Sequence, residues 1–378
     1  MKPPHRCLLA LLVCALVTPL HAADMYVYFG TNRAGPGIGF SLAHFDTDTG
    51  VLSQPKFLTE AVKPAFFAIH PDGRHLYSVN SGSPGGVSAY AIDPASGNLT
   101  LLNRVPSGGD DANYICLDQT RHFVLVANYE DGSVSAFALE PDGRIGARTA
   151  YIRHTGSSVN PTRQKHPYVH SIIISPDNRF ALAADLGVDR LFVYRFDAAT
   201  GSLAPNDPPF ATVAPGSGPR HVKFHPNGRW VYLINEMGCT LAVFSWDPAR
   251  GALAAIETVP TLPAGFTGVN NCAEVIIHPN GRFLYASNRG HNSLAVFAID
   301  QATGRLTLVE HTPSRGIKPR NFSFDPTGRW IVCSNHDSNN AVVFRVDGAT
   351  GRLTPVGEPV SLFSPFCQRF LPVAQPQG

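Results

Sequence analysis

The chain has 378 residues, of which 44% are hydrophobic and 15% charged, so it can form a large core and is too weakly charged to be disordered. The formal net charge is +2 and no long basic run occurs, which argues against nucleic acid as a partner. Glycine and proline are frequent but dispersed, as is typical of short strands joined by turns.

The N-terminus has the pattern of a secretory signal peptide. Lys2, His5 and Arg6 precede the apolar run CLLALLVCALV, which is followed by TPLHAAD. The apolar run is shorter than the roughly 20 residues that a membrane-spanning helix needs. We therefore expect a signal peptide over residues 1–23, cleaved after Ala22 or Ala23, and a periplasmic or secreted mature protein with no membrane association.

Five cysteines remain after this cleavage. An odd number without CxxC spacing argues against a disulfide framework and against a structural zinc site. We interpret them as small apolar residues of strands, and leave open one bridge between Cys239 and Cys272. The five are Cys116, Cys239, Cys272, Cys333 and Cys367.

A tight-turn sequence recurs along the mature chain. The arginines in the copies are 47 to 58 residues apart, which matches the length of a four-stranded propeller blade. The copies are HPDGR at 70–74, DQTR at 118–121, SPDNR at 175–179, HPNGR at 225–229, HPNGR at 278–282 and DPTGR at 325–329.

Each copy predicts four strands in the same order. An apolar stretch such as RHVKF leads into the turn, and WVYLIN follows it. A third stretch such as LAVFSW comes next, and a Gly-x-Leu turn as in ATGRLT begins the last strand. Valine, phenylalanine, tyrosine and isoleucine dominate these stretches, as strands prefer.

The two ends of the mature chain complete one blade between them. The first copy begins at YVYFGT and has no first strand, whereas SPFCQRF at 364–370 aligns with GPRHVKF at 218–224. Pairing of these ends removes exposed sheet edges. We therefore predict an all-β, seven-bladed β-propeller over residues 24–378, with four-stranded antiparallel blades and a ring closed by its N- and C-terminal segments. Two domains or an open β array would be the alternatives, but the even spacing favours the closed ring.

Two positions of each copy, the start of the first strand and the end of the second, should meet at one mouth of the central channel, because both lie at the end of the inner hairpin opposite the turn. The end of the second strand varies between copies, through Asn32, Ser81, Tyr129, Leu186, Glu236, Arg289 and His336. The start of the first strand also varies, through Ala65, Asn113, His170, Arg220, Ala273, Arg320 and Phe366. The residue immediately before the variable end of the second strand is nearly constant, as a structural strand-end residue would be. These residues are Thr31, Asn80, Asn128, Asp185, Asn235, Asn288 and Asn335.

The variable positions suggest an asymmetric ligand bound in a nearly symmetric ring. Two arginines can hold a carboxylate, a phosphate or a developing oxyanion, and a histidine can take a proton from water. The candidate catalytic residues are His170, Glu236, Arg220 and Arg289. The candidate substrate-binding residues are His221, Asn235, Glu274, Asn288, Arg320, Asn321 and His336. A surface ion-pair network around the channel is the alternative interpretation. The turn histidines His70, His225 and His278 are interpreted as structural.

At these residues the chain resembles the lactonase family of seven-bladed β-propellers, which includes bacterial 6-phosphogluconolactonases and the fungal 3-carboxy-cis,cis-muconate lactonizing enzyme. The matching stretches are GPRHVKFHPNGRWVYLINE, CAEVIIHPNGRFLYASNRGHNSLAVF, KPRNFSFDPTGRW and RQKHPYVHS. The resemblance implies an active site of one histidine, two arginines and one glutamate, which fall on His170, Arg220, Glu236 and Arg289. Many members read Pro-His-x-His where this chain has Tyr168 as the second residue.

The sequence thus predicts an exported lactonase that opens a sugar-acid lactone, similar to 6-phosphogluconolactonase but acting on an unphosphorylated lactone. His170 would activate water with help from Glu236, while Arg220 and Arg289 would bind the anionic group and the oxyanion. No metal-ligand spacing or phosphate-binding glycine loop occurs, so no metal or cofactor is expected. Lactonization at the same site and a propeller that only binds a ligand remain open. We expect a monomer or weak homo-oligomer whose partner is a small lactone or organic acid.

Overall fold

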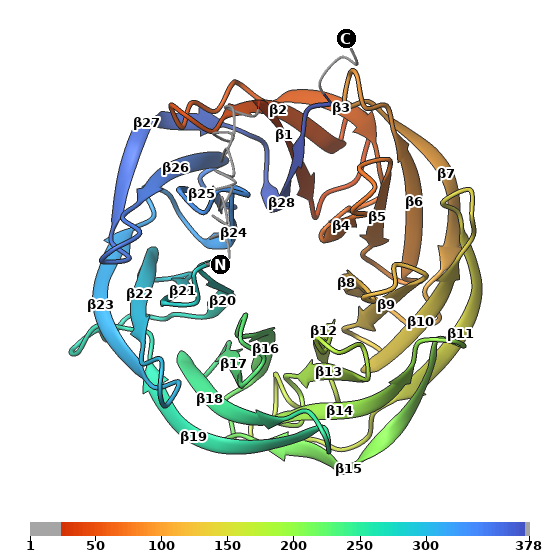
Figure 1. Ribbon diagram of the computed structural model, residues 1–378, viewed down its shortest axis with the longest axis vertical. Helices are drawn as coiled ribbons and strands as arrows, with labels where there is room; N and C mark the ends of the chain where they lie inside the picture. Colours follow the sequence, from red (N-terminus) through yellow and green to blue (C-terminus); the bar gives the residue numbers. More distant parts are fainter. Residues whose placement is uncertain (1–23, 375–378) are drawn as a thin grey trace, which may run out of the picture.

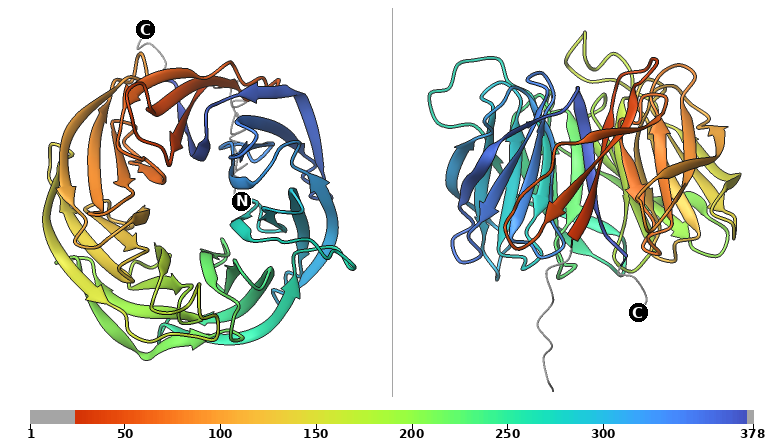
Figure 2. Two further views of the ribbon diagram at one scale, coloured as in Figure 1. Left: turned by 180° about the vertical axis from the view of Figure 1, so that it is seen from behind. Right: turned by 90° about the horizontal axis from the view of Figure 1, so that it is seen from above.

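The computed structural model describes residues 24–374, which form seven four-stranded antiparallel sheets around a central channel (Figure 1). Seen from the side, the sheets form a thick ring (Figure 2). The predicted all-β, seven-bladed propeller is confirmed, and no helix occurs within the described range. The predicted signal peptide over 1–23 lies outside the described residues. None of the described segments is a helix that could cross a membrane.

The strands are named here blade by blade, from the channel outward. Blade one contains β28 (Pro365–Pro372), β1 (Asp24–Thr31), β2 (Gly39–Asp46) and β3 (Lys56–Glu60); blade two contains β4 (Phe67–Ile69), β5 (His75–Asn80), β6 (Gly86–Ile92) and β7 (Leu99–Pro106); blade three contains β8 (Ala112–Leu117), β9 (Phe123–Asn128), β10 (Ser133–Leu139) and β11 (Ile145–Arg153). Blade four contains β12 (Val169–Ile174), β13 (Phe180–Asp185), β14 (Arg190–Asp197) and β15 (Ser202–Thr212); blade five contains β16 (Pro219–Phe224), β17 (Trp230–Asn235), β18 (Thr240–Asp247) and β19 (Ala252–Pro260). Blade six contains β20 (Cys272–Ile277), β21 (Phe283–Asn288), β22 (Ser293–Ile299) and β23 (Leu306–Pro313); blade seven contains β24 (Pro319–Phe324), β25 (Trp330–Asn335), β26 (Asn340–Val346) and β27 (Leu353–Ser361).

The C-terminal strand closes the ring as the sequence predicted. β28 pairs antiparallel with β1, and Val27 faces Phe370 in the register of the two strands. The end of the chain therefore supplies the innermost strand of the blade that the beginning of the chain starts (Figure 1).

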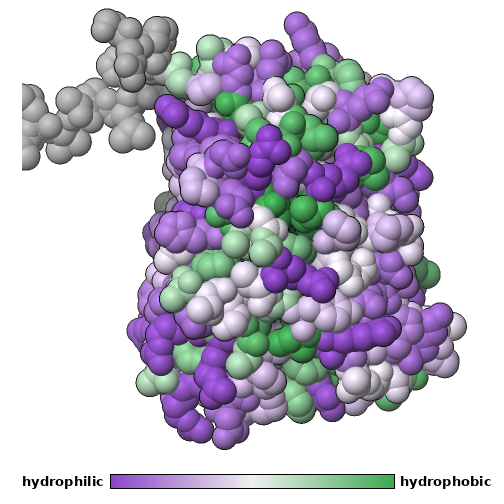
Figure 3. Space-filling model, turned by 90° about the vertical axis from the view of Figure 1, so that its right-hand side faces the viewer, coloured by the Kyte–Doolittle hydropathy of each residue, from purple (hydrophilic) through white to green (hydrophobic). Residues whose placement is uncertain are grey.

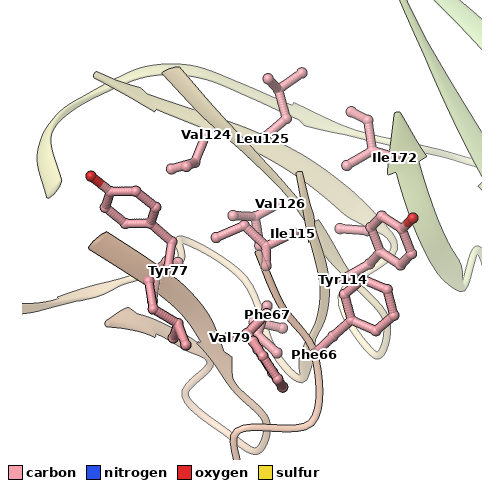
Figure 4. Close-up of a cluster of buried hydrophobic side chains, with 14 of the residues drawn as sticks. Phe66, Phe67, Tyr77, Val79, Tyr114, Ile115, Val124, Leu125, Val126 and Ile172 are labelled. Atoms are coloured by element: carbon pink, nitrogen blue, oxygen red, sulfur yellow. The ribbon is translucent and has the colours of Figure 1, made fainter. Parts of the chain in front are cut away.

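The core lies between the faces of neighbouring blades. The second strands, such as β17 and β21, are buried along their whole length because a blade covers each face. Between blades two and three, the stacked rings of Phe66 and Tyr114 lie at one end of the cluster and Tyr77 at the other (Figure 4). The outermost strands face solvent, and on the side seen in Figure 3 small hydrophobic areas alternate with hydrophilic ones.

The repeated turn joins neighbouring blades as well as the two strands of a hairpin. Gly228 and Gly281 adopt φ values of 70° and 71°, which a residue with a side chain rarely takes. The ring nitrogen Nε2 of His225 donates to the carbonyl of Gly281 at 2.7 Å, and Nε2 of His278 donates to that of Gly328 at 3.1 Å. These contacts give His225 and His278 the structural role predicted for them.

The five cysteines within residues 24–374 are free thiols. Cys272, Cys333 and Cys367 are buried, and Cys116 and Cys239 are half-buried. The bridge between Cys239 and Cys272 that the sequence left open is not formed, and both side chains instead take part in local hydrogen bonds near Asn270.

Candidate functional site

The inner strands present their first side chains to the channel through β-bulges. The pairing register between first and second strands skips one residue in each of five blades, and the skipped residues are Asn113, His170, Arg220, Arg320 and Phe366. A bulge inserts an extra residue that takes no place in the ladder and turns its side chain in a new direction. The five skipped residues are all among the seven variable first-strand positions that the sequence singled out.

A cavity of about 260 Å³, which we call the mouth cavity, collects these positions. Its walls come from all seven blades and from the segment between β11 and β12, so residues far apart in the sequence meet there. The lining residues are Asn32, Ser81, Asp111, Asn113, Tyr129, Arg163, His170, Glu236, Arg289 and Arg320. Of the predicted catalytic residues, His170, Glu236 and Arg289 therefore face one space, together with the predicted substrate-binding residue Arg320.

The Glu236 carboxylate is the centre of a cluster of three arginines. Its Oε2 accepts from Arg220 Nε at 3.0 Å and forms an ion pair with Arg289 Nη2 at 2.8 Å, and its Oε1 accepts from Arg163 Nη2 at 2.7 Å. Burial alone would raise the pKa of this carboxyl, but the arginine charges outweigh burial and hold the pKa far below its usual range. Glu236 is therefore an anion at neutral pH and has no proton to donate.

Arg220 and Arg289 differ in exposure although both contact the same oxygen atom. Arg220 is fully buried and also donates through Nη1 to the carbonyl of Ala273 at 2.6 Å. Burial and the neighbouring Arg289 lower the pKa of Arg220 to about 10, so the guanidinium stays charged at neutral pH. Arg289 lines the mouth cavity and donates to the carbonyl of Cys272 at 2.8 Å.

His170 is a buried, neutral imidazole at the wall of the mouth cavity. Burial, and then the charge of Arg220, lower its pKa well below the usual value, so the ring is uncharged at neutral pH. Its Nε2 lies 3.9 Å from Glu236 Oε2. On the other side of the ring, Asn113 Nδ2 lies 2.9 Å from His170 Nδ1 and 3.3 Å from the His170 carbonyl oxygen. The imidazole is thus held between an amide and an anion.

Arg320 is the cation of this cavity without a carboxylate partner. Within residues 24–374 no acidic oxygen lies within ion-pair distance of Arg320, and its buried Nε has no hydrogen-bond partner. Its guanidinium lies 3.6 Å from the centre of the Phe366 ring, which β28 supplies. A buried donor without an acceptor costs about 1–3 kcal/mol, which a bound anion or oxygen ligand would offset.

A second polar network extends the site along the channel. His221 Nδ1 lies 2.9 Å from Glu274 Oε1, and Asn321 donates to the other Glu274 oxygen. Burial lowers the pKa of His221 to about 3. Burial raises the pKa of Glu274, but His221 and Lys223 outweigh it and bring that pKa to about 2. His221, Asn321 and Arg220 line a hollow next to the mouth cavity, whereas Glu274 lies behind them as a fixed anion.

Besides Glu274, three of the predicted substrate-binding residues line neither the mouth cavity nor the hollow next to it. Asn235 donates to Thr240 Oγ1 at 2.9 Å, and Asn288 donates to the carbonyl of Thr261 at 2.9 Å. Both are buried at strand ends, so we assign them the structural role that their nearly constant position also suggested. His336 lies in a separate hollow, where its Nδ1 is 2.6 Å from Asp337 Oδ1.

The sequence did not single out Arg163 or Asp111. Arg163 comes from the segment between β11 and β12, in the longest interval between turn arginines, 58 residues from Arg121 to Arg179. Long connections in compact domains are often functional, so that interval was the available signal. Asp111 precedes β8, and burial raises the pKa of its carboxyl. The half-buried Tyr129 was on the variable list but had no assigned role.

A family model described as lactonase, 7-bladed beta-propeller, matches residues 26–370. The chain belongs to this lactonase family. The 6-phosphogluconolactonase of Bacillus subtilis (strain 168) is 35% identical over 299 residues, which is 79% of this chain and 84% of that protein. The 6-phosphogluconolactonase of Formosa agariphila is 33% identical over 296 residues, 77% of this chain and 83% of that protein.

Among solved structures, the periplasmic gluconolactonase PpgL of Pseudomonas aeruginosa is 33% identical and superposes with a TM-score of 0.88. The match covers 93% of this chain and 100% of that chain. The predicted family is confirmed, and these lactonase relatives support the predicted enzyme class, a lactone hydrolase similar to 6-phosphogluconolactonase.

Proposed function

We propose that this protein is an exported lactonase that hydrolyses an unphosphorylated sugar-acid lactone in the mouth cavity. The observation that carries the proposal is the combination of one neutral histidine, His170, with an unpartnered arginine, Arg320, in the same cavity. A neutral imidazole can accept a proton, and a free guanidinium can stabilise the negative charge that develops on a carbonyl oxygen.

In the proposed reaction, His170 Nε2 takes a proton from a water molecule whose oxygen bonds to the lactone carbonyl carbon. The carbonyl oxygen becomes an oxyanion held by Arg320 and Arg289. When the tetrahedral intermediate collapses, the bond between the carbonyl carbon and the ring oxygen breaks. The proton on His170 passes to the ring oxygen, which leaves as an alcohol, and the product is an open-chain acid that ionises.

This role requires a particular arrangement of the Asn113 amide. For Nε2 to accept a proton, Nδ1 must carry hydrogen and donate it to the amide oxygen of Asn113. A half-turn of the amide exchanges its oxygen and nitrogen with little movement of heavy atoms. Burial and Arg220 lower the pKa of His170, and the developing oxyanion offsets the arginine charge as the proton arrives.

Glu236 has a different role in this proposal from the one expected from sequence. Because its pKa is held far below its usual range, Glu236 positions the arginines and does not deliver protons. Its two oxygens hold Arg163, Arg220 and Arg289 in fixed places, so these guanidinium groups are already oriented before substrate arrives. Fixed charges of this kind stabilise a transition state without reorganising during the reaction.

The preference for an unphosphorylated lactone is supported by the charges in the cavity. Three of the four arginines already share the Glu236 carboxylate, and Asp111 adds another acid to the wall. Arg320 is the one of these arginines without a carboxylate partner among the described residues, so the cavity has little uncompensated positive charge, which suits a single oxyanion better than a phosphate dianion. The family's Pro-His-x-His pattern is also interrupted here by Tyr168, whose ring stacks on His166. The periplasmic gluconolactonase PpgL is a relative whose name fits an unphosphorylated substrate and an exported location.

The experiment compares purified mature protein on glucono-lactone and on its 6-phosphate, with acid release followed by a pH indicator. We expect the unphosphorylated lactone to be opened with at least about tenfold higher kcat/KM, and His170→Gln to lower it by about 10²–10⁴-fold. His122→Gln, at an exposed histidine outside the channel, is the matched control and should leave the rate unchanged. Faster turnover of the phosphate ester, or an unaffected His170 variant, would contradict the proposal.

A separate measurement tests export. The full chain, expressed with its N-terminus intact, should be recovered from the periplasmic fraction with a mature N-terminus at Ala23 or Asp24, as read by mass spectrometry. Recovery of the uncleaved chain from the cytoplasmic fraction would contradict the predicted signal peptide and leave the catalytic proposal standing.

A further inference from the structure

The β4–β5 turn of blade two gathers two imidazoles and a carboxylate at one point, which we call the blade-two triad: His70, Asp72 and His75. His70 Nδ1 lies 3.0 Å from Asp72 Oδ1, and His75 Nδ1 lies 2.8 Å from Asp72 Oδ2. One ligand atom from each of the three residues lies within 4.8 Å of the other two. The triad is at the turn end of the inner hairpin, opposite the end that supplies the mouth cavity.

Equivalent turns in the same chain lack this cluster. Blade two reads HPDGRH, whereas blade five reads HPNGRW and blade six reads HPNGRF. In the blade-five turn, His225 Nε2 donates to the carbonyl of Gly281, which joins the two blades. No such donation by His70 Nε2 occurs among the described residues. Blade two therefore keeps the backbone of the repeated turn but replaces an amide and a buried aromatic ring by a carboxylate and a second imidazole.

The surroundings hold the triad in place and leave it open to ions. The side chains of His70, Asp72 and His75 are 20%, 33% and 19% exposed. The His75 ring stacks against Tyr77 and lies against Gly143, where an added Cβ would come within 2.2 Å of His75 Nε2. The Asp72 carboxylate also accepts from the Arg74 backbone amide at 2.7 Å, which orients it within the turn.

We propose that the blade-two triad is a binding site for a divalent cation of the zinc type. Imidazole nitrogens together with a carboxylate oxygen are the ligand set of Zn²⁺ and neighbouring transition metals. Bonds of about 2.0–2.2 Å to a tetrahedral ion separate its ligand atoms by roughly 3.3 Å, so the present spacing needs only small movements. Ca²⁺ and Mg²⁺ prefer oxygen ligands and should bind poorly.

Such an ion would stabilise the shortest inner hairpin of the ring. β4 has three residues, and its ladder with β5 has three residue pairs, whereas the β16–β17 ladder has five. His70 follows β4 and His75 begins β5, so a metal bound to both would join the strands on either side of the turn. The bound ion would thus stabilise the blade that lies next to the ring closure.

The test titrates tag-free, chelator-treated mature protein with ZnCl₂ by isothermal calorimetry. We expect one site per chain. We also expect the double variant Asp72→Asn, His75→Phe, which restores the blade-six residues, to bind at least about tenfold more weakly, because even loss of a residue that only supports a ligand costs about 10–100-fold. His44→Ala is the matched control, since His44 pairs with Asp24 at 3.1 Å on the surface without a third ligand, and its affinity should equal wild type.

Hydrogen exchange gives a second readout at the site itself. Zn²⁺ should slow exchange of the β4–β5 amides in wild type and not in the double variant. If the double variant does not fold, Asp72→Asn alone replaces it, because this side chain is exposed and its loss leaves the turn intact. The proposal is overturned if wild type binds no Zn²⁺, if the variants bind it as tightly as wild type, or if Ca²⁺ binds equally well.

Discussion

The two ends of the inner hairpins differ in how much their residues vary between blades. At the turn end, blades five and six repeat the same residues and the same backbone, with Gly228 and Gly281 in one conformation. At the other end the backbone again repeats, through a bulge in several blades, but the side chains change from Asn113 to His170 to Arg220. Positions that only serve the fold vary little between copies, and positions that meet a ligand are free to differ. Substitutions at the mouth end and at the turn end should therefore have different effects on activity and stability.

The largest effect is expected from removing the charge at the centre of the arginine cluster. Glu236→Gln keeps the shape of the side chain but leaves three guanidinium groups without their shared anion. Breaking a buried ion pair in this way should lower the free energy of unfolding by about 3–5 kcal/mol, as measured by chemical denaturation. Glu358→Gln, at an ion pair where the carboxylate is 91% exposed, should change it by less than about 1 kcal/mol. If both substitutions lowered the free energy of unfolding equally, the ion pairs at the mouth would stabilise the fold no more than a surface ion pair does.

Arg320→Met should weaken substrate binding with little change in stability. The guanidinium lacks a carboxylate partner in the described residues, so its removal breaks no ion pair, and methionine still packs on Phe366. Loss of one charged hydrogen bond to substrate, worth about 1.5–3 kcal/mol, should lower kcat/KM for the lactone at least about tenfold. Steady-state kinetics check this, and an unchanged kcat/KM would show that Arg320 does not meet the substrate.

Asn113→Asp should move the pH dependence of activity. Burial and Arg220 lower the pKa of His170, and a carboxylate beside Nδ1 would raise it. A base works only when unprotonated, so the acidic limb of kcat/KM should move to higher pH by about one pH unit or more. Asn128→Asp, at a buried strand-end amide of the same blade, controls for added charge. If the acidic limb of kcat/KM stayed at the same pH, His170 would not be the base.

The smallest effect on activity is expected at the turn end. Gly228→Ala has open space around the new methyl group, but its φ of 70° is strained for alanine and should cost about 1–2 kcal/mol of stability. Gly348→Ala, also in open space but without positive φ, should be neutral or slightly stabilising. Lactone hydrolysis should be unchanged in both variants, and a loss of activity in Gly228→Ala would show that the turn end affects the mouth.

Much of the fold could be predicted because its signals are local and repeated. The proline-and-glycine turns fixed the blade length, and SPFCQRF supplied the missing strand that β28 provides. One detail of the alignment was wrong. Arg121 stands at the positive-φ position of its turn, with φ of 67°, where other copies have Gly73 or Gly228, so it is not equivalent to the other turn arginines.

The site could be predicted only where it follows the repeat. Aligned positions placed His170, Glu236 and Arg289 together, because every blade delivers the same position to the same place. Arg163 could not be found in that way, since its segment has no counterpart in other blades. The bulges were also invisible, because a skipped residue leaves no mark on hydrophobic alternation over so short a strand.

Closure by the last strand has a consequence for how the molecule is made. Phe366 of β28 stacks on Arg320, so the wall of the site is complete only when the final residues of the chain have been added. A ribosome that has finished six blades has still produced an open arc with an unpaired edge at β1. Such a chain stays incompletely folded until late in synthesis, which is compatible with the export that we propose for this protein.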